Sequence, residues 1–349
     1  MARILLTGST GYIGSHTAVA LLEAGFDVVG LDNYSRSLNG VSRRIQEITG
    51  KNYAQYQVDL VDAEAITNVL AHESGIDAVI HFAAFKAVGE SSTHPLLYFR
   101  NNLGGQINLM QACDQFGITN LVFSSSCTVY GNPEQIPVTE DSPLLEPESP
   151  YGRTKAVGEA LLRDWVKSNA AQQGKAKHVI ALRYFNPAGA HPSARIGECT
   201  VGVPDNLIPY ITQTALGKRE KLTVFGNDYP TRDGTCLRDY IHVCDIAAAH
   251  VDAVNHLLNQ GSLTAPWSVY NLGTGVGQTV LEIIQAFEAV NQIKLPWSFG
   301  PRRPGDVIAV YANNRKAVDE LGWQIRYNLE DMMRSAWNWE RMQAQDPLH

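Results

Sequence analysis

Cysteine is scarce in this chain, and its placement serves no obvious structural purpose. Five cysteines occur among 349 residues, an odd number, and none forms a CxxC pair. This pattern disfavours a disulfide framework or a zinc ribbon, and it favours a reducing compartment. The ten histidines include no HExxH motif and no paired ligand spacing. We therefore expect no metal site.

Long apolar runs and an excess of positive charge are also lacking. No uninterrupted apolar run approaches 18 residues, and an apolar strand pattern begins by residue 4 of the opening sequence MARILLTG. These features predict neither a membrane span nor a secretory signal. The formal net charge of −7 gives no support to a nucleic-acid partner. The expectation is a cytoplasmic globular protein, whose 44% hydrophobic residues are enough for a sizeable core.

Short apolar runs alternate with longer amphipathic stretches through the first half of the chain. The runs predict strands at 4–7, 27–32, 53–59, 77–83, 120–126 and 178–184. The stretches between them predict helices at 12–24, 62–74, 96–116 and 151–169. Alternation of this kind predicts the α/β class, with a doubly wound parallel Rossmann-type sheet covered by helices on both faces.

The pattern changes from residue 187, where Pro, Gly and Asn become frequent. A helix at 244–258, a strand at 268–273 and a capped helix from Thr279 are expected beyond this stretch. We predict a nucleotide-binding Rossmann domain over 1–186, to which the chain returns near 235–275. The remainder of 187–349 is expected to form mainly a smaller C-terminal α/β substrate-binding lobe.

A glycine-rich turn follows the first predicted strand. Gly8, Gly11 and Gly14 have the spacing G-x-x-G-x-x-G and lead into the first predicted helix. Glycine allows a tight turn and a close approach of backbone N–H groups to a pyrophosphate at the helix N-terminus. A glycine-rich turn without a ligand is the alternative, but the order of strand, motif, helix, strand and acid favours dinucleotide binding.

The acid in that order is Asp32, which ends the second predicted strand 18 residues beyond Gly14. A carboxylate at this position can accept hydrogen bonds from the adenosine ribose hydroxyls. It favours NAD over NADP, because a 2′-phosphate would meet a negative charge. Arg36 nearby weakens this preference slightly, although an exposed loop arginine is the simpler interpretation.

Tyr151 and Lys155 form the main catalytic candidate. Ser149 and Pro150 predict a helix start, so the two residues lie one turn apart on one face. Lowering a tyrosine pKa from 10 to about 7 requires roughly 4 kcal/mol. One cation at about 4 Å with an effective dielectric of ~20 supplies this amount. A surface pair is the alternative, but the pair follows a strand ending in Ser124–Ser126, at the sheet edge where ligands bind.

These motifs are accompanied by several longer strings that together carry a resemblance. The strings are TGSTGYIGSHT, DNYSRS, VIHFAAFKAVGES, FSSSCTVYG, SPYGRTK, RYFNPAGAHPS, NLIPYI, FGNDYPTRDGTCLRDYIHV, YNLGTGVG and PRRPGD. The sequence resembles the extended short-chain dehydrogenase/reductase superfamily and, within it, the UDP-glucose (UDP-galactose) 4-epimerases. The resemblance covers nearly the whole chain.

The resemblance implies specific site residues. It implies that Tyr151, Lys155 and Ser126 are catalytic. Residues at positions that contact the cofactor NAD are Gly8, Gly11, Tyr12, Ile13, Gly14, Asp32, Asn33, Asp59, Phe82, Ala83, Lys86, Asn101, Ser124, Tyr151, Lys155 and Tyr184. Residues at positions that contact the UDP-sugar are Ser126, Asn186, Asn206, Leu207, Phe225, Arg238, Arg303, Asp306 and Val310. Arginines suit the pyrophosphate of such a substrate.

The resemblance also implies an activity and an assembly. The activity is NAD-dependent inversion at C4 of a UDP-hexose through a transient 4-keto sugar, with Tyr151 transferring the proton. The assembly is a homodimer. A nucleotide-sugar 4,6-dehydratase is disfavoured, because Cys127 and Thr128 follow Ser126 where dehydratases carry Asp-Glu. A UDP-uronate 4-epimerase or another nucleotide-sugar-modifying short-chain dehydrogenase remains an alternative, and so does a cofactor-sensing regulatory protein.

One position departs from the pattern of strict glucose/galactose epimerases. They often carry a bulky tyrosine against the hexose 2-substituent, and the matching position here is Val310, with Tyr311 next. If Val310 faces the sugar, the additional space predicts acceptance of UDP-N-acetylhexosamines.

Overall fold

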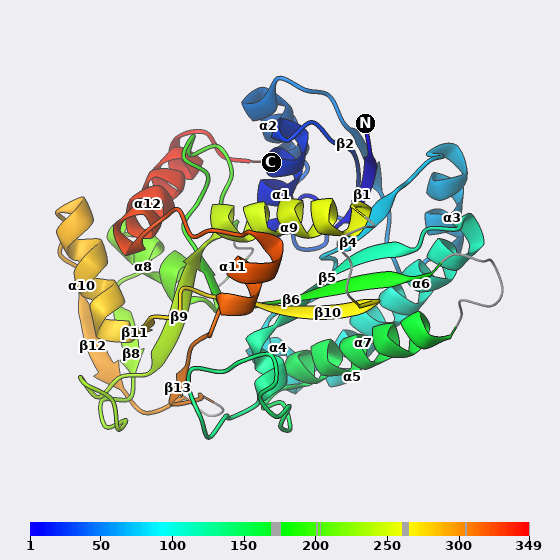
Figure 1. Ribbon diagram of the computed structural model, residues 1–349. Coiled ribbons are helices and arrows are strands. Elements are labelled where there is room, and N and C mark those ends of the chain that lie inside the picture. The colour runs from blue at the N-terminus through cyan, green and yellow to red at the C-terminus, as the bar shows by residue number, and fades with distance from the viewer. Residues whose placement is uncertain (169–175, 200–201, 203, 260–264, 304–305, 349) are drawn as a thin grey trace.

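A seven-stranded parallel sheet forms the centre of the molecule (Figure 1). The computed structural model describes residues 1–349 except 169–175, 200–201, 203, 260–264, 304–305 and 349. The sheet strands are β1 (Arg3–Thr7), β2 (Asp27–Asp32), β3 (Ala54–Gln57), β4 (Ala78–His81), β5 (Asn120–Ser126), β6 (His178–Tyr184) and β10 (Trp267–Leu272). Their order is β10-β6-β5-β4-β1-β2-β3, and every pair is parallel. The predicted fold class is confirmed.

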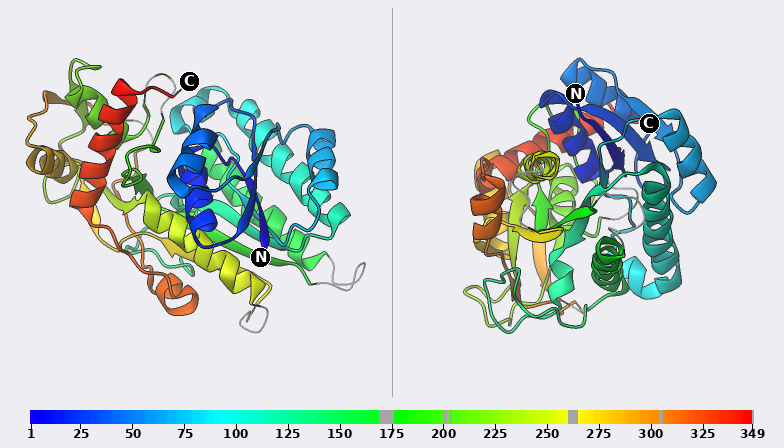
Figure 2. Two further views of the ribbon diagram at one scale, coloured as in Figure 1. Left: turned by 90° about the horizontal axis from the view of Figure 1, so that it is seen from above. Right: turned by 45° about the vertical axis from the view of Figure 1, so that its right-hand side comes forward.

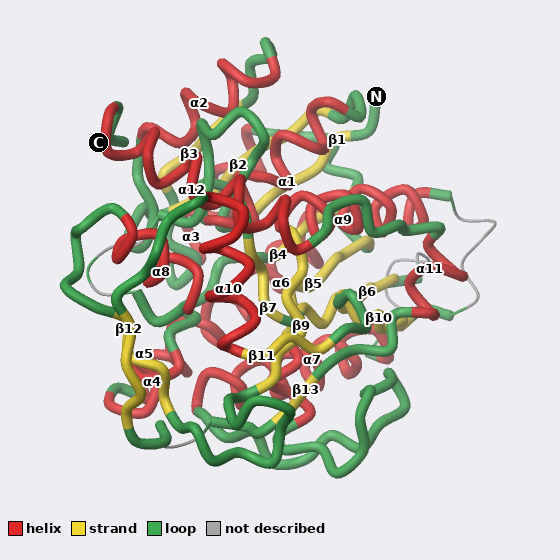
Figure 3. The backbone as a smooth tube through the Cα atoms, turned by 90° about the vertical axis from the view of Figure 1, so that its left-hand side faces the viewer, coloured by secondary structure: helices red, strands yellow, loops and turns green. Residues whose placement is uncertain are grey.

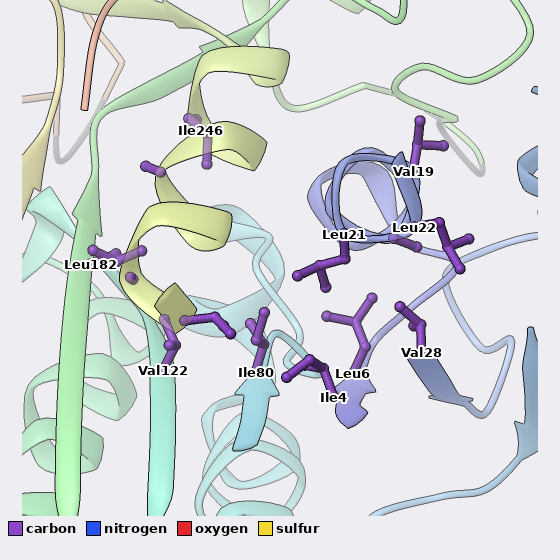
Figure 4. Close-up of a cluster of buried hydrophobic side chains, with 14 of the residues drawn as sticks. Ile4, Leu6, Val19, Leu21, Leu22, Val28, Ile80, Val122, Leu182 and Ile246 are labelled. Atoms are coloured by element: carbon purple, nitrogen blue, oxygen red, sulfur yellow. The ribbon is translucent and has the colours of Figure 1, made fainter. Parts of the chain in front are cut away.

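Alternate residues of the strands face two different helical layers. Ile4 and Leu6 of β1 belong to one buried cluster, whereas Leu5 between them belongs to another. The first layer consists of α1 (Tyr12–Glu23), α2 (Gly40–Thr49) and α9 (Val243–Leu258), and Figure 4 shows Leu21 and Ile246 of this layer above the strands. The second layer consists of α3 (Ala63–His72), α6 (Gly105–Phe116) and α7 (Pro150–Lys167), and Figure 1 shows α7 below the sheet.

The predicted helix at 96–116 contains an irregular turn. It consists of α5 (Pro95–Tyr98), a π-helical turn at Phe99–Gly104 and α6, preceded by the short α4 (Val88–Thr93). A π-helical turn widens the helix by one residue and is common at functional sites. The predicted helix at 151–169 is α7, and its last predicted residue lies outside the described residues.

A second group of strands and helices lies beside the large sheet, and Figure 3 views the molecule from this side. One small sheet has the order β11-β9-β13, with β7 also paired to β9, and the other joins β12 to β8. These strands are β7 (Asn186–Ala188), β8 (Leu222–Phe225), β9 (Leu237–His242), β11 (Gly277–Thr279), β12 (Trp297–Gly300) and β13 (Ala309–Val310). The accompanying helices are α8 (Leu207–Ala215), α10 (Val280–Asn291) and α12 (Leu329–Gln345), whereas α11 (Arg315–Leu321) packs against α9 and β10 of the large sheet.

The chain crosses between the two groups more than once. After β7, α8, β8 and β9, it returns to the large sheet as α9 and β10, and β10 pairs with β6 over Trp267–Leu272. Figure 2 shows α9 lying along the large sheet from a second direction. Within the expected return at 235–275, α9 and β10 join the large sheet, whereas β9 belongs to the smaller one. Among the described residues, no helix is long and apolar enough to cross a membrane.

Candidate active site

The turn after β1 requires glycine at two positions, Gly8 and Gly14. Gly8 has a φ of +70°, and a Cβ there would lie 2.8 Å from the backbone nitrogen of Ala83, just after β4. A Cβ on Gly14 would lie 2.0 Å from the Gly8 carbonyl oxygen. Because real Cβ atoms do not approach other atoms this closely, the turn brings α1, β1 and β4 together only without these side chains. The turn lies between β1 and β4, where the strand order reverses, and ligands of open α/β sheets bind at that point.

The first turn of α1 offers free backbone donors at this position. Gly11 precedes the 12-residue helix without a side-chain cap, and no acidic residue occupies the first turn. The first amides of a helix have no partners within it, and they attract an anion together with the helix dipole. The cradle that a Cβ would fill and the uncapped amides together fit the pyrophosphate of a dinucleotide.

Asp32 connects the end of β2 to this turn. Its carboxylate accepts hydrogen bonds from the backbone N–H groups of Thr10 (3.1 Å) and Tyr34 (2.9 Å) and from the Ser37 hydroxyl (3.0 Å). The next residue, Asn33, donates to a carboxylate oxygen of Asp59 at 3.1 Å. The structure thus brings three of the predicted cofactor residues together at the carboxyl end of β2.

The three predicted catalytic residues meet at the carboxyl end of β5. Ser149 caps α7 by accepting from the Gly152 N–H at 3.1 Å, and this cap fixes the turn that carries Tyr151. Lys155 is buried, and its Nζ donates to the carbonyl oxygen of Ser124 at 2.6 Å. Ser126 is the last residue of β5, and its hydroxyl acts to lower the pKa of Tyr151.

Burial dominates the charge states of this group. It raises the pKa of Tyr151 to about 12, against the opposing effect of the Ser126 hydroxyl. It lowers the pKa of Lys155 to about 7, against the opposing effect of the Glu159 carboxylate. The chain's own residues therefore keep the phenol protonated at neutral pH, and Lys155 is bonded to Ser124. The lowering of the Tyr151 pKa expected from the sequence needs a further positive charge at this place.

Three more of the predicted cofactor residues, Phe82, Tyr184 and Asn101, lie near the same edge of the sheet. Phe82 follows β4, and its ring lies 4.6 Å from that of His250 on α9. The Tyr184 hydroxyl at the end of β6 lies 2.6 Å from His250 Nε2, so one histidine of α9 orders two of these side chains. Asn101 in the π-helical turn donates to Asn102 Oδ1 at 2.9 Å.

The start of α1 and the segment after β4 contribute three further predicted cofactor residues. The Tyr12 hydroxyl donates to the Gly189 carbonyl oxygen at 2.5 Å, after β7. Ile13 packs against the buried cluster under α1. The Lys86 ammonium lies 2.7 Å from a carboxylate oxygen of Glu198 and 5.8 Å from the centre of the Tyr12 ring.

Several predicted substrate residues lie on or near the strands of the smaller sheets. Both predicted arginines approach Asp306, at 2.7 Å for Arg303 and 3.6 Å for Arg238. The Phe225 ring at the end of β8 is 43% exposed, and the Arg303 guanidinium lies 6.0 Å from its centre. The structure thus places the Arg303 guanidinium beside an exposed aromatic ring, a combination that suits a phosphorylated nucleotide.

Asn206, Leu207 and Asn186 occupy the boundary between the two groups of strands. Asn206 immediately precedes α8, whose first residue is Leu207. The Asn206 amide donates to the same Glu198 oxygen that Lys86 contacts, at 2.7 Å. Asn186 begins β7 one residue after the end of β6 and lies opposite Tyr240 of β9. These residues therefore connect the edge of the large sheet with the smaller sheets.

Val310 lies opposite Arg238 in the pairing of β13 with β9. It is 6% exposed and packs in an apolar cluster with Val129, Tyr130 and Phe185. Val129 and Tyr130 belong to the short 3-10 turn that follows Ser126, and Phe185 follows Tyr184. Val310 therefore belongs to an apolar wall beside the Ser126 end of β5, and the cluster does not include Tyr311.

Sequence reasoning missed three buried or half-buried residues of this region. Asn102 exchanges hydrogen bonds with the backbone of Phe85 and donates to Thr154 on α7 at 3.0 Å. Glu198 accepts from Lys86 and Asn206, and Glu159 accepts from four donors beneath Lys155. Only Glu159 had a local signal, because it continues the four-residue spacing of Tyr151 and Lys155 along one helix face.

The sequence of the chain is similar to that of known proteins over nearly its whole length. A model of the family described as GDP-mannose 4,6-dehydratase matches residues 5–336. A UDP-glucose 4-epimerase of Bacillus subtilis is 51% identical over 337 residues, covering 97% of this chain and 96% of that protein.

Two solved structures also superimpose closely. A UDP-glucose-4-epimerase from Stenotrophomonas maltophila with bound NAD and formylated UDP-arabinopyranose has a TM-score of 0.93 and 46% identity, covering 99% of both chains. A UDP-glucose 4-epimerase from Bifidobacterium longum in complex with NAD⁺ and UDP has a TM-score of 0.92 and 41% identity, also covering 99% of both chains. The resemblance found in the sequence is confirmed, and the chain belongs to the UDP-glucose 4-epimerase family.

Proposed function

We propose that this chain is an NAD-dependent UDP-glucose 4-epimerase, which interconverts UDP-glucose and UDP-galactose through a transient 4-keto sugar. The observation that carries the proposal is the convergence of Tyr151, Lys155 and Ser126 at the carboxyl end of β5. This group lies on the sheet edge that also carries the glycine turn after β1. The membership of the chain in this family supports the same conclusion.

We propose that the cofactor is held along the carboxyl edge of the large sheet. The amides at the start of α1 bind its pyrophosphate, and Asp32 with Asn33 and Asp59 orients the adenosine end. NAD held there would supply the hydride acceptor and donor for the sugar C4 and a positive charge in the site. Lys155 holds the nicotinamide ribose by its ammonium group, from a position fixed by the Ser124 carbonyl.

We propose that Tyr151 moves the proton of the sugar 4-hydroxyl and that Ser126 orients the oxygen. A phenol with a pKa of about 12 is a poor base, so the positive charge of the oxidised cofactor, added to the ammonium of Lys155, would have to lower this pKa in the holoenzyme. Tyr151 accepts the proton as C4 is oxidised and donates it again after the sugar has turned. No net redox change results.

We propose that Arg238 and Arg303 bind the substrate pyrophosphate and that the exposed Phe225 ring packs against the base. Asn206 and Leu207 at the start of α8 add contacts from the other side, and Asn186 and Asp306 complete the site. Strong contacts to the nucleotide with few to the hexose allow the 4-keto sugar to present its opposite face. Val310 leaves space beside the 2-substituent, so the proposed substrates include UDP-N-acetylhexosamines.

The dehydratase alternative is disfavoured by the residues after Ser126. Burial raises the pKa of the Cys127 thiol to about 12, and Thr128 is not an acid or a base at neutral pH. Neither group can remove a C5 proton or protonate a C6 hydroxyl. A UDP-uronate 4-epimerase shares the same first step, and only a substrate panel separates it from the proposed activity.

We further propose a cytoplasmic homodimer. Exposed apolar side chains on α5, α6 and α7 support an assembly through these helices: Leu96 (81% exposed), Leu97, Ile107 and Val157. Within each chain, residues 1–186 with the later return near 235–275 form the proposed NAD domain, and most of 187–349 forms the proposed substrate lobe. Light scattering on the purified chain tests the assembly.

The decisive experiment is turnover of a panel by the purified chain: UDP-glucose, UDP-galactose, their N-acetyl forms and UDP-glucuronate. The proposal expects interconversion of UDP-glucose and UDP-galactose without net accumulation of reduced cofactor. Exclusive turnover of UDP-glucuronate, or net production of reduced cofactor, would refute it.

A further inference from the structure

Glu159 forms the centre of a buried polar cluster directly beneath the catalytic group. It lies one helical turn beyond Lys155 and two beyond Tyr151 on α7, and it is 1% exposed. Its Oε1 accepts from the Ser125 hydroxyl (2.6 Å) and from Arg183 Nε (2.9 Å). Its Oε2 accepts from Arg183 Nη2 (2.7 Å) and from Arg163 Nη2 (3.1 Å). The carboxylate is therefore fully bonded, with a bidentate guanidinium partner.

These bonds join the elements that carry the site. Ser125 lies between Ser124, whose carbonyl accepts from Lys155, and Ser126 at the strand end. Arg183 on β6 precedes Tyr184 and donates through Nη1 to the Tyr130 hydroxyl at 2.9 Å. Tyr130 ends the 3-10 turn after Ser126 and donates to Asn271 Oδ1 of β10 at 2.7 Å. One carboxylate thus connects α7, β5 and β6, and its network reaches β10.

We propose that Glu159 is a positioning residue for the epimerisation, holding Tyr151 and Lys155 of α7 in fixed register against Ser126 of β5. The inference rests on the proposed function and adds a residue to its machinery. Glu159 acts through other residues, since its carboxylate bonds to Ser125 of β5 and Arg183 of β6. Arg163 lies on the outer side of α7, and its bond to this carboxylate joins neither strand.

Stability alone does not account for this cluster. A buried ion pair loses so much hydration that well-packed apolar residues are often at least as stabilising. What apolar residues cannot supply is the directional bond to Ser125, which fixes the height of α7 over β5. A misplacement of about 1 Å at a reacting centre can reduce a rate about 100-fold. Positioning therefore explains why a carboxylate lies at this place.

Glu159 also supports the charge on Lys155. Its negative charge favours the ammonium form of Lys155, which burial disfavours. The other titratable or charged groups of this region are His81 on β4, which faces Lys155, Tyr184 on β6, which faces Tyr151, and Arg183 and Arg163, which bond to Glu159. Burial lowers the pKa of His81 to about 3, so it is neutral at working pH and Glu159 is the anion of this group. Removing the charge should therefore shift the basic limb of the pH–rate profile.

The test compares three variants of the full-length, NAD-loaded enzyme. Glu159→Gln removes the charge and should lower kcat for UDP-galactose by about 10- to 100-fold, with KM changed less than about 3-fold. The basic limb of its kcat profile should move to lower pH by about one unit. Ser125→Ala keeps the ion pair, removes only the bond to β5, and should lower kcat by about 5- to 10-fold. Arg163→Gln removes a donor from the half-exposed side of α7 and should retain wild-type kcat.

The following results would overturn the inference. Wild-type kcat and pH profile in Glu159→Gln would do so, as would wild-type kcat in Ser125→Ala if Glu159→Gln failed to fold. An equal loss of kcat in Arg163→Gln would show a general loss of helix stability instead of positioning. Absence of turnover in the wild type would refute the proposed function itself, whereas an active wild type with unaffected variants would refute only this inference.

Discussion

Replacing Gly14 by alanine should weaken cofactor binding, because the added methyl has no space between α1 and β1. Its Cβ would lie 2.0 Å from the Gly8 carbonyl oxygen, about 1.4 Å short of ordinary contact. The neighbouring atom is backbone, so the helix or the turn itself must move. Overpacking of this kind costs about 1 to 3 kcal/mol. When this free energy is lost from NAD binding, the Kd for NAD should rise roughly 5- to 150-fold.

The measurement is the NAD content of the purified chain, followed by titration of the stripped protein with NAD by calorimetry. The matched control is Gly89→Ala in α4, where a Cβ would meet nothing within 4 Å. This control should bind NAD as the wild type does, and the helical alanine should leave the chain at least as stable. A Gly14→Ala chain with wild-type affinity for NAD would refute the close approach of α1 to the turn as the basis of binding.

Three further predictions address the chemistry, the specificity and the pH dependence of stability. Tyr151→Phe should lower kcat by about 10²- to 10⁴-fold with unchanged NAD content, and sugar interconversion at full rate would contradict the role of the phenol. Val310→Tyr should abolish turnover of UDP-N-acetylgalactosamine and retain that of UDP-galactose, measured with matched substrate concentrations; loss of both activities, or of neither, would show that this position does not face the 2-substituent. Lowering the pH from 7 to 5 should reduce the free energy of unfolding in urea. Burial holds the pKa of His16, His81 and His250 at about 3, below that of an unfolded histidine, so protons bind preferentially to the unfolded chain. Each histidine should contribute a loss of roughly 2 kcal/mol at pH 5, and a flat stability profile over this range would disprove their buried neutral state.

Strand and helix positions in the first half could be predicted from local pattern. All six predicted strands lie in the large sheet, because a parallel strand covered on both faces is a short apolar run bounded by turns. Thr279 caps α10 through a capping box, as its position before an apolar helical pattern indicated. The π-helical turn at Phe99–Gly104 has no such signature, since it depends on contacts between Asn102 and distant residues.

The site was predictable where its chemistry depends on short spacing. The glycines of the first turn and the Tyr151–Lys155 pair are close in sequence, so their geometry follows from one turn or one helix. Glu198 and Arg183 are different, because Glu198 accepts from Lys86, 112 residues away, and Arg183 donates to Glu159, 24 residues away. The pairing of Lys155 with the Ser124 carbonyl also depends on how α7 packs on β5, which no local pattern fixes.

The late return of β10 to the edge of β6 has a consequence for biosynthesis. While the ribosome adds the residues between Tyr184 and Leu272, β6 can pair with β5 but not with β10, so one of its edges stays unpaired. At about 5 to 20 residues per second this interval lasts roughly 4 to 18 s. An unpaired strand edge invites association with other chains, so an emerging polypeptide should be most susceptible to aggregation, and most dependent on chaperones, during this interval.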